Sequence, residues 1–383
     1  MRLWKISSVW FEEAAMIRYR PERILVQKES WKDRTAHEIL ERLPGVPVDT
    51  IDEVDHALPE LKRSSDPRAS GKRCLILTRH LGRFLKDCPG AGAEICCNYF
   101  VVNFASNCHM ECTYCFLQSY LNNPALIIFT NIEDLLAEVG ERVSHASGRL
   151  FRIGTGELAD SLALDDITQY SRRLVPFFGS LPNAILELKT KSDRVDNLQG
   201  LRHRDRTVVS WSMNSKRMTR EEELKTASFE ERLDAARRCQ GWGYRIGFHF
   251  DPLIHYDGWE RDYEEAVAEV FRVVDPARVS WVSLGSLRFT PSLREIVRER
   301  FPHSIVPYGE FVRGNHGKTR YFRPIRSEMY SKMEAWIHQA APGVFVYLCM
   351  ENRAAWEGSF PHVPRDTADL SDRMDSLVQI SHG

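Results

Sequence analysis

Three cysteines stand in a C-x3-C-x2-C spacing: Cys108, Cys112 and Cys115. Thiolates are the usual ligands of iron–sulfur clusters, and close spacing on one loop lets several of them reach a single cubane cluster. Such a loop leaves one iron without a nearby cysteine, and an open iron is a place for chemistry. The alternative is a structural zinc site completed by His109 or a distant cysteine, but zinc sites typically pair C-x2–4-C units and the second unit is missing here. The spacing therefore favours an iron–sulfur loop, with His109 as part of its packing.

Small and polar residues recur where the strands that we expect after this loop come to an end. The glycines of residues 154–157 let the backbone approach a ligand closely, and the carboxylate there could accept hydrogen bonds from an ammonium group. Each residue singly could be surface decoration, but together they outline a site. The candidates for binding a cofactor are Gly154, Gly156, Glu157, Lys191, Ser212 and Asn214.

His249 and Asp251 stand two residues apart at the end of another expected strand. Because side chains alternate along a strand, the two lie on the same side of it. They could line the pocket or bond to each other.

The elements that must position these residues alternate between strands and helices. Repeated βα units predict a parallel sheet, and a spacing of about 25–50 residues per unit suits a barrel or part of one, with its chemistry at the carboxyl ends of the strands. We therefore predict an α/β protein with a partial (βα)6 TIM-like barrel. The expected strands are residues 99–105, 150–154, 184–190, 207–213, 244–250 and 279–284, and the helical windows between them include 132–144, 164–178, 228–242 and 261–274.

The barrel pattern covers the middle of the chain and predicts three parts. Residues 1–98 form a small N-terminal α/β region, with a strand at 23–27 and a helix at 33–43. Residues 99–325 form the partial barrel. Residues 326–383 form a C-terminal extension, in which a helix that begins at 324 and a strand at 344–348 precede a polar tail that we expect to be loose beyond Pro361.

The composition is that of an ordinary globular protein, with 43% hydrophobic and 27% charged residues. A net charge of −1 neither demands nor excludes a polyanionic partner, so any nucleic-acid face must be local. No run of residues approaches membrane-spanning length and the N-terminus shows no apolar signal core, which predicts a cytoplasmic protein without a membrane partner. Nine cysteines, three of them on one loop, fit a reducing compartment and metal ligation better than a disulfide framework.

The cysteine loop, with Tyr114 before the third cysteine, resembles that of the radical S-adenosylmethionine (SAM) superfamily. The resemblance implies a [4Fe–4S] cluster on the three cysteines and SAM bound at the open iron through its amino and carboxylate groups. One electron from the cluster would then cleave SAM and yield a 5′-deoxyadenosyl radical. Residues 154–157 resemble the superfamily's Gly-Gly-Glu-like segment, which contacts the methionyl amine.

The chain is also similar to the spore photoproduct lyase family, radical SAM enzymes that revert a UV-induced thymine dimer in DNA. This resemblance implies a radical SAM type of partial barrel, a carbon–carbon lyase acting in DNA repair, Lys191 as a cofactor contact, and an electron donor such as flavodoxin or ferredoxin. It covers about residues 20–325. The matching segments are 21–26, 115–118, 189–191, 195–198, 212–214, 231–236, 243–244 and 258–260.

Two departures from that family concern the fate of the radical. The lyase has a hydrogen-donating cysteine shortly after the second strand, and alignment through Asp160 puts Glu157 there. The lyase also has tyrosines on both sides of the third cluster cysteine, whereas this chain has Tyr114, our candidate catalytic residue, and Phe116. The departures leave open a radical SAM enzyme with another substrate. A noncatalytic, metal-stabilised nucleic-acid-binding protein is an alternative of another class.

A basic and aromatic segment, residues 313–323, lies where the lyase has a DNA-contacting hairpin. Cations interleaved with aromatic residues suit nucleic acid, and the candidate DNA contacts are Arg313, Lys318, Arg320 and Arg323. Four further cysteines could bind a second cluster, simply be buried, or include a hydrogen-atom donor: Cys88, Cys96, Cys97 and Cys349. We expect Cys74 to be a core residue of a strand and Cys239 to be a core residue of a helix.

Overall fold

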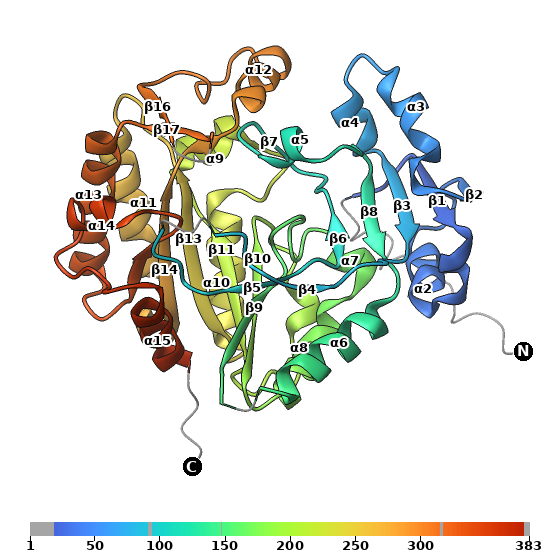
Figure 1. Cartoon of the computed structure of the whole chain (residues 1–383), viewed down its shortest axis with the longest axis horizontal. Coiled ribbons are helices and arrows are strands. Elements are labelled where there is room, and N and C mark those ends of the chain that lie inside the picture. The colour runs from blue at the N-terminus through green and yellow to red at the C-terminus, as the bar shows by residue number, and fades with distance from the viewer. Residues whose placement is uncertain (1–18, 91–93, 147, 315–316, 379–383) are drawn as a thin grey trace, which may run out of the picture.

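The computed structural model describes residues 19–90, 94–146, 148–314 and 317–378. Two sheets lie side by side in it: an eight-stranded sheet curls around the centre of the molecule, and a five-stranded sheet lies on the N-terminal side (Figure 1). The N-terminal residues that bear on an export signal lie outside the described part of the chain.

The eight-stranded sheet is parallel except at one edge, where β4 and β5 are antiparallel. It curls into a half barrel (Figure 1), which confirms the predicted α/β fold with a partial TIM-like barrel. In spatial order its strands are β18 (Val346–Leu348), β14 (Val279–Ser286), β13 (Arg245–Leu253), β11 (Thr207–Ser212), β10 (Ala184–Thr190), β9 (Phe151–Gly154), β5 (Phe100–Val102) and β4 (Leu85–Asp87).

Five of the six predicted barrel strands are confirmed, as β9, β10, β11, β13 and β14. The predicted strand 99–105 is wrong as one element, because the chain crosses between the sheets within it. Phe100–Val102 is β5 of the curled sheet, whereas Ala105–Ser106 is β6 of the other sheet. Phe100–Val102 and Ala105 are all buried, so the apolar run carries no sign of the crossing.

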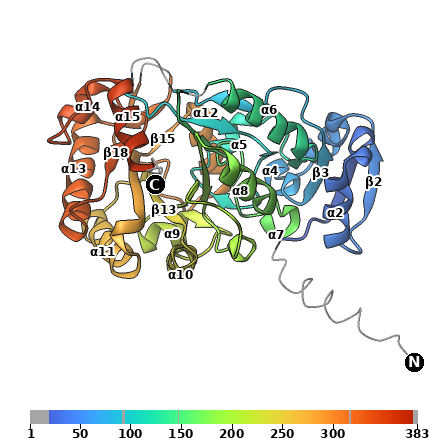
Figure 2. The same cartoon turned by 90° about the horizontal axis from the view of Figure 1, so that it is seen from below.

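Helices alternate with the barrel strands and cover the outside of the half barrel (Figure 2). The window 228–242 begins with a capping box, in which Ser228 and Glu231 each bond to the other's backbone amide. The window 164–178 is broken at Gln169, whose φ of +50° is left-handed and ends α7. The helices of this layer are α6 (Ile132–Ser144), α7 (Asp165–Thr168), α8 (Ser171–Ser180), α10 (Phe229–Gly241), α11 (Trp259–Val273) and α13 (Arg323–Ala340).

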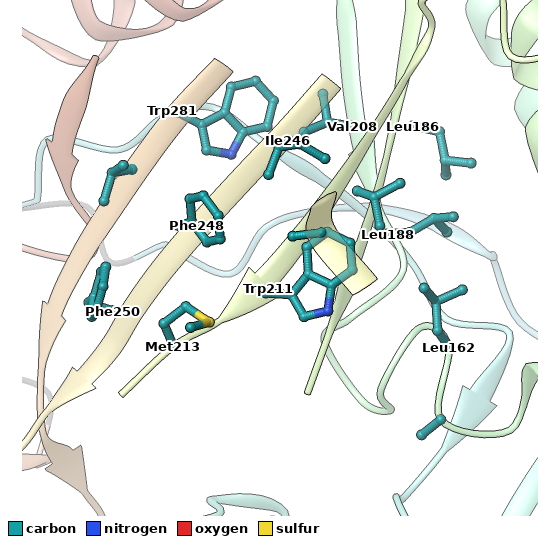
Figure 3. Packing of buried hydrophobic residues seen from close by; sticks show 14 of the residues in the cluster. Leu162, Leu186, Leu188, Val208, Trp211, Met213, Ile246, Phe248, Phe250 and Trp281 are labelled. Atoms are coloured by element: carbon teal, nitrogen blue, oxygen red, sulfur yellow. The ribbon is translucent and has the colours of Figure 1, made fainter. Parts of the chain in front are cut away.

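The two faces of the curled sheet differ in chemistry. The face towards the helices is apolar, and Figure 3 shows Leu188, Trp211 and Phe248 packed within it. The opposite face carries polar side chains from alternating positions, so that Ser210 and His249 both bond to Glu187. Strand alternation therefore lines the inside of the half barrel with groups suited to chemistry.

The five-stranded sheet takes strands from two stretches of the chain. The structure confirms the strand expected at 23–27 and the expectation that Cys74 is a core residue of a strand, which is Cys74–Thr78. The short strand Leu126–Phe129 was not predicted. The sheet includes strands from both sides of residue 98, and the division of the chain at that residue stays a prediction. Its order is β2 (Val48–Ile51), β1 (Arg23–Gln27), β3 (Cys74–Thr78), β8 (Leu126–Phe129) and β6.

Smaller elements complete the described chain. Two small sheets consist of β7 (Glu111–Cys112) with β12 (Glu223–Leu224), and of β15 (Arg288–Phe289), β17 (Thr319–Tyr321) and β16 (Phe311–Arg313). The short helices are α2 (Arg34–Arg42), α3 (Leu58–Lys62), α4 (Pro67–Gly71), α5 (Leu117–Tyr120), α9 (Lys216–Glu222), α12 (Pro291–Arg300) and α14 (Arg353–Glu357).

The tail beyond Pro361 is not loose as far as the structure describes it. Residues Thr367–Val378 form α15, which packs against β14 and bonds to the first residue of β13, Arg245, through the Leu377 carbonyl. Arg152 of β9 donates hydrogen bonds to Asp375 at 2.7 Å and to Ser371 at 3.1 Å. The expectation of a loose tail was wrong because it rested on the polar composition of the tail, which does not show these contacts with residues distant in sequence. Across the described residues, every helix is too short or too polar to cross a lipid bilayer.

Candidate active site

The cysteine loop follows β6 and is fixed at several points. Asn107 turns the chain at a φ of +73°, and its side-chain oxygen accepts a hydrogen bond from the Cys108 amide at 2.8 Å. Further along, β7 pairs with β12, so that Cys112 lies opposite Glu223. Gln118 donates from Nε2 to the carbonyl oxygen of Cys112 at 3.1 Å. The protein's own hydrogen bonds therefore define the shape of the loop.

The three thiols of the loop lie close enough to interact electrostatically with one another. All are free; Cys112 is buried, whereas Cys108 and Cys115 are partly exposed. Burial raises the pKa of the Cys108 thiol to about 12, and it raises the pKa of Cys112 as well. Iron or another cation would have to supply the positive charge that makes these thiols into thiolates.

The donor set fits a multi-iron cluster. Among the described residues, no three His, Cys, Asp or Glu side chains gather closely enough for one metal ion. A cubane cluster needs no such convergence, because each thiolate binds a different iron. His109 packs its ring against Tyr19, with 5.0 Å between ring centroids, which confirms its predicted packing role.

Glu223 connects three of the predicted site residues, although sequence analysis did not select it. Its Oε1 accepts a hydrogen bond from the Tyr114 hydroxyl and another from Asn214 Nδ2 at 3.3 Å. Lys191 Nζ lies 3.5 Å from the same oxygen, and Arg232 Nη1 lies 2.6 Å from Oε2. Glu223 thus connects the cysteine loop with the ends of β10 and β11.

The charge of Glu223 is held by its cationic partners. Burial opposes ionisation, but Arg232 and then Lys191 outweigh it and lower the pKa of Glu223 to about 2. Arg232 also donates to the backbone oxygen of Ser212 at 2.9 Å, so Ser212 joins this group through its main chain.

The glycine segment is packed tightly after β9. A Cβ atom on Gly154 would lie 1.6 Å from the Tyr99 hydroxyl, so packing against Tyr99 accounts for that glycine. A Cβ atom on Gly156 would lie 3.1 Å from Lys189 Cβ. Glu157 Oε2 accepts a hydrogen bond from Asn103 Nδ2 at 3.0 Å, a partner outside the Glu223 group.

Asp160, which follows the glycine segment, is hydrogen-bonded to residues at the end of β10. Its Oδ1 accepts from the Thr190 hydroxyl at 2.6 Å, and its Oδ2 accepts from the Lys191 amide at 2.7 Å. Asp160 therefore positions the backbone of Lys191. It also contributes to the wall of a pocket beside Cys108.

A second buried carboxylate organises the inside of the half barrel. Glu187 accepts hydrogen bonds from Tyr99, Ser210, His249 at 2.9 Å and Trp281 at 3.0 Å. Burial opposes its ionisation, but His249 and these donors lower the pKa of Glu187 to about 2.

His249 and Asp251 take different partners. Asp251 pairs with Arg288 through both carboxylate oxygens, at 3.1 and 3.0 Å. His249 bonds to Glu187, so the hypothesis that the two residues bond to each other is wrong. Both still face the inside of the half barrel.

The basic segment forms the hairpin of β16 and β17; Asn315 and His316 lie outside the described residues. Arg313 and Arg323 are exposed, whereas Arg320 pairs with Glu94 and Glu351 at 3.4 Å each. Burial lowers the pKa of Lys318. The exposed aromatic residues near the hairpin are Tyr308 and Phe322.

A half barrel of mainly parallel strands, with a three-cysteine loop after the crossing from β5 to β6, identifies the chain as a radical SAM enzyme. Residues 87–347 match the family model for spore photoproduct lyase, and the chain belongs to that family. Family membership confirms the resemblance described above and implies the iron–sulfur cluster; it does not support the noncatalytic alternative.

Two relatives of this chain are spore photoproduct lyases. The lyase of Geobacillus sp. (strain Y412MC61) is 28% identical over 229 residues, which are 58% of this chain and 67% of the relative. The lyase of Bacillus subtilis (strain 168) is 24% identical over 233 residues, again 58% of this chain and 67% of the relative. The alignments therefore span about two thirds of each relative.

Solved structures of spore photoproduct lyase share the fold. A single-residue mutant superposes with a TM-score of 0.78 at 24% identity and covers 86% of this chain and 99% of its own. Spore photoproduct lyase complexed with dinucleoside spore photoproduct gives 0.76 at 23% identity, covering 87% of this chain and all of its own. A double mutant contains bound AdoMet and the dinucleoside.

Proposed function

We propose that this protein is a spore photoproduct lyase-like enzyme that uses SAM and a [4Fe–4S] cluster to act on a thymine photoproduct in DNA. The observation that carries the proposal is the linkage of the cysteine loop to Lys191 and Asn214 through Glu223. The family match supports the same reaction class.

Cys108, Cys112 and Cys115 would hold the cluster, and Gly156, Glu157, Lys191, Ser212 and Asn214 are the candidate contacts of SAM. When bound, the cluster and SAM together supply a 5′-deoxyadenosyl radical after one electron from a donor such as flavodoxin or ferredoxin. The chain's own task is to position the reacting groups and exclude water.

Tyr114 is the candidate radical relay. Its hydroxyl is buried and bonded to Glu223, and burial raises its pKa well above the usual value. The phenol therefore keeps its proton until it is oxidised, when Glu223 could accept that proton. Phe116, by contrast, is exposed and has no hydroxyl for such a step.

The hairpin supplies a surface for DNA. Arg313, Lys318 and Arg323 would contact phosphates, and the exposed aromatic residues nearby could stack on bases. Arg320 would hold the hairpin to Glu94 and Glu351.

A second candidate is a radical SAM enzyme that acts on another substrate. Glu157 favours it, because a carboxylate takes the place that the lyase gives to its hydrogen-donating cysteine. The two candidates share the cluster and SAM and differ in what reacts with the radical.

Incubation of the reconstituted, reduced protein with SAM and dinucleoside spore photoproduct separates the two candidates. The proposal predicts 5′-deoxyadenosine together with repaired thymidine dinucleoside, both measured by mass spectrometry. 5′-Deoxyadenosine without repair would support the second candidate. No 5′-deoxyadenosine from a protein that has its full complement of iron and sulfide would contradict both.

A further inference from the structure

Four cysteines outside the cluster loop lie near the two edges of the half barrel. The strands β4 and β18 form the two edges of the curled sheet, and a crossing segment, residues 94–98, bridges to the chain that follows β18. Ile95 of this crossing segment donates from its amide to the Glu351 oxygen at 3.0 Å, in an isolated bridge. The four are Cys88 after β4, Cys96 and Cys97 in the crossing segment, and Cys349 after β18.

Cys88 lies on a fixed backbone beside the glycine segment. Its amide donates to the Tyr99 carbonyl at 2.8 Å, and its own carbonyl accepts from the Gly90 amide at 2.7 Å. Its partly exposed thiol interacts electrostatically with Glu157 and with Lys189 of β10. Cys88 lies opposite Tyr99 in the antiparallel pairing of β4 and β5, and Tyr99 points inward to Glu187 and packs against Gly154. Because residues directly opposite each other share a face of the sheet, Cys88 faces the inner side of the half barrel, towards the segment in which Glu157 replaces the family's donor cysteine.

The other three thiols have different surroundings. Cys96 packs against Gly90, where a Cβ atom would lie 3.0 Å from its sulfur. The Cys349 thiol interacts electrostatically with Asp251 and Arg288. It also interacts with Lys189 and with Cys88 itself, so Cys349 is the comparison residue for Cys88.

We propose that Cys88 donates the hydrogen atom that ends the reaction. The inference rests on the proposed function, in which cleavage of the photoproduct leaves a carbon-centred radical on the substrate. The S–H bond of Cys88 breaks, a C–H bond forms on the substrate carbon, and a thiyl radical remains on Cys88. A low-molecular-weight thiol returns a hydrogen atom to that sulfur before the next turnover, and two of the resulting small thiyl radicals combine to form a disulfide. The Glu157 carboxylate cannot serve as the donor, because an O–H bond is stronger than the C–H bond it would form.

A single turnover in D2O without added thiol tests the assignment. Thiol hydrogens exchange with D2O and carbon-bound hydrogens do not, so the wild-type product gains one deuterium on carbon. We expect Cys88→Ala and Cys88→Ser each to lower the amount of deuterated product about tenfold or more, while 5′-deoxyadenosine still forms. Serine keeps the size of the side chain, so a merely structural role would be rescued by it.

Matched variants complete the test. Cys74→Ala removes a buried thiol from the five-stranded sheet and should leave the label unchanged. Label that persists in Cys88→Ala, or that disappears in Cys349→Ala instead, would overturn the assignment. No 5′-deoxyadenosine from the wild-type protein would mean that the proposed function itself has failed.

A second readout needs no turnover. In the reconstituted, unreduced protein with SAM, dinucleoside spore photoproduct should slow maleimide labelling of Cys88 about fivefold, as measured by mass spectrometry. Labelling of Cys88 at the same rate with and without the dinucleoside would place it outside the substrate's reach and contradict its role as donor.

Discussion

The hydroxyl of Tyr114 donates a hydrogen bond to Oε1 of Glu223, and both side chains are buried. Tyr114 stands within the cysteine loop, whereas Glu223 comes from the short strand that pairs with that loop. The bond therefore ties the residue before the third cysteine to the cations Lys191 and Arg232. A change of charge on the cysteine loop would therefore alter the electrostatic environment of these four residues.

Replacing Glu223 with glutamine should destabilise the fold. Glu223 and Arg232 have fully buried side chains, so Glu223→Gln leaves an uncompensated buried guanidinium, at a cost of about 3–5 kcal/mol. Denaturant unfolding measures the change in the free energy of unfolding. Glu265→Gln, at an exposed position on α11, is the control and should change it little. If Glu223→Gln leaves the free energy of unfolding unchanged, the buried pair of Glu223 and Arg232 does not stabilise the fold.

Stability should fall in acid because of two buried carboxylates. Glu187 and Glu223 have pKa values of about 2, below the ordinary value of 4.5 that each has when unfolded. A lowered folded pKa stabilises the fold above pH 4.5, and this contribution is lost as the pH falls from about 4.5 to about 2. Thermal unfolding across this window should show a steep drop that Glu187→Gln reduces. An identical pH profile for that variant would contradict the role of Glu187.

Gly154 should not tolerate a methyl group. In Gly154→Ala the new Cβ would overlap the Tyr99 hydroxyl, and the forced shift should cost about 1–3 kcal/mol in the free energy of unfolding. Gly343→Ala points into open space and serves as the control. Adding Tyr99→Phe to Gly154→Ala removes the clashing oxygen and should recover part of the loss. Equal stability of the two glycine variants would show that Tyr99 does not fill this space.

Arg313 and Arg323, at the hairpin and directly after it, should increase the affinity for DNA by contacting its phosphate groups. For Arg313→Ala combined with Arg323→Ala, the slope of log K against log salt should become shallower by about 0.9 for each lost phosphate contact. Fluorescence anisotropy with a DNA duplex measures it. The paired change Lys62→Ala and Arg63→Ala, on the exposed surface at α3, is the control. If both double variants bind DNA with the wild-type salt slope, the hairpin is not the DNA surface.

The strand positions of the site could be predicted, but the contacts between them could not. Lys191 and Asn214 follow buried strands whose apolar runs are visible in the sequence. Glu223 joins them from a two-residue strand with no pattern of its own, and it pairs with a loop more than a hundred residues earlier. Asp160 can be recognised in the sequence, but its hydrogen bond with the Lys191 amide could not be predicted from it. Short strands and long-range polar contacts leave no periodic signal.

The most direct test of the central claim is anaerobic iron and sulfide analysis combined with SAM cleavage, on the wild-type protein and on the variant with alanine at Cys108, Cys112 and Cys115. The account predicts about four irons and four sulfides per wild-type chain, a brown colour, and 5′-deoxyadenosine on reduction with SAM. The variant should lose all three, whereas Cys74→Ala should keep them. A triple variant that stays brown or still cleaves SAM would contradict the account.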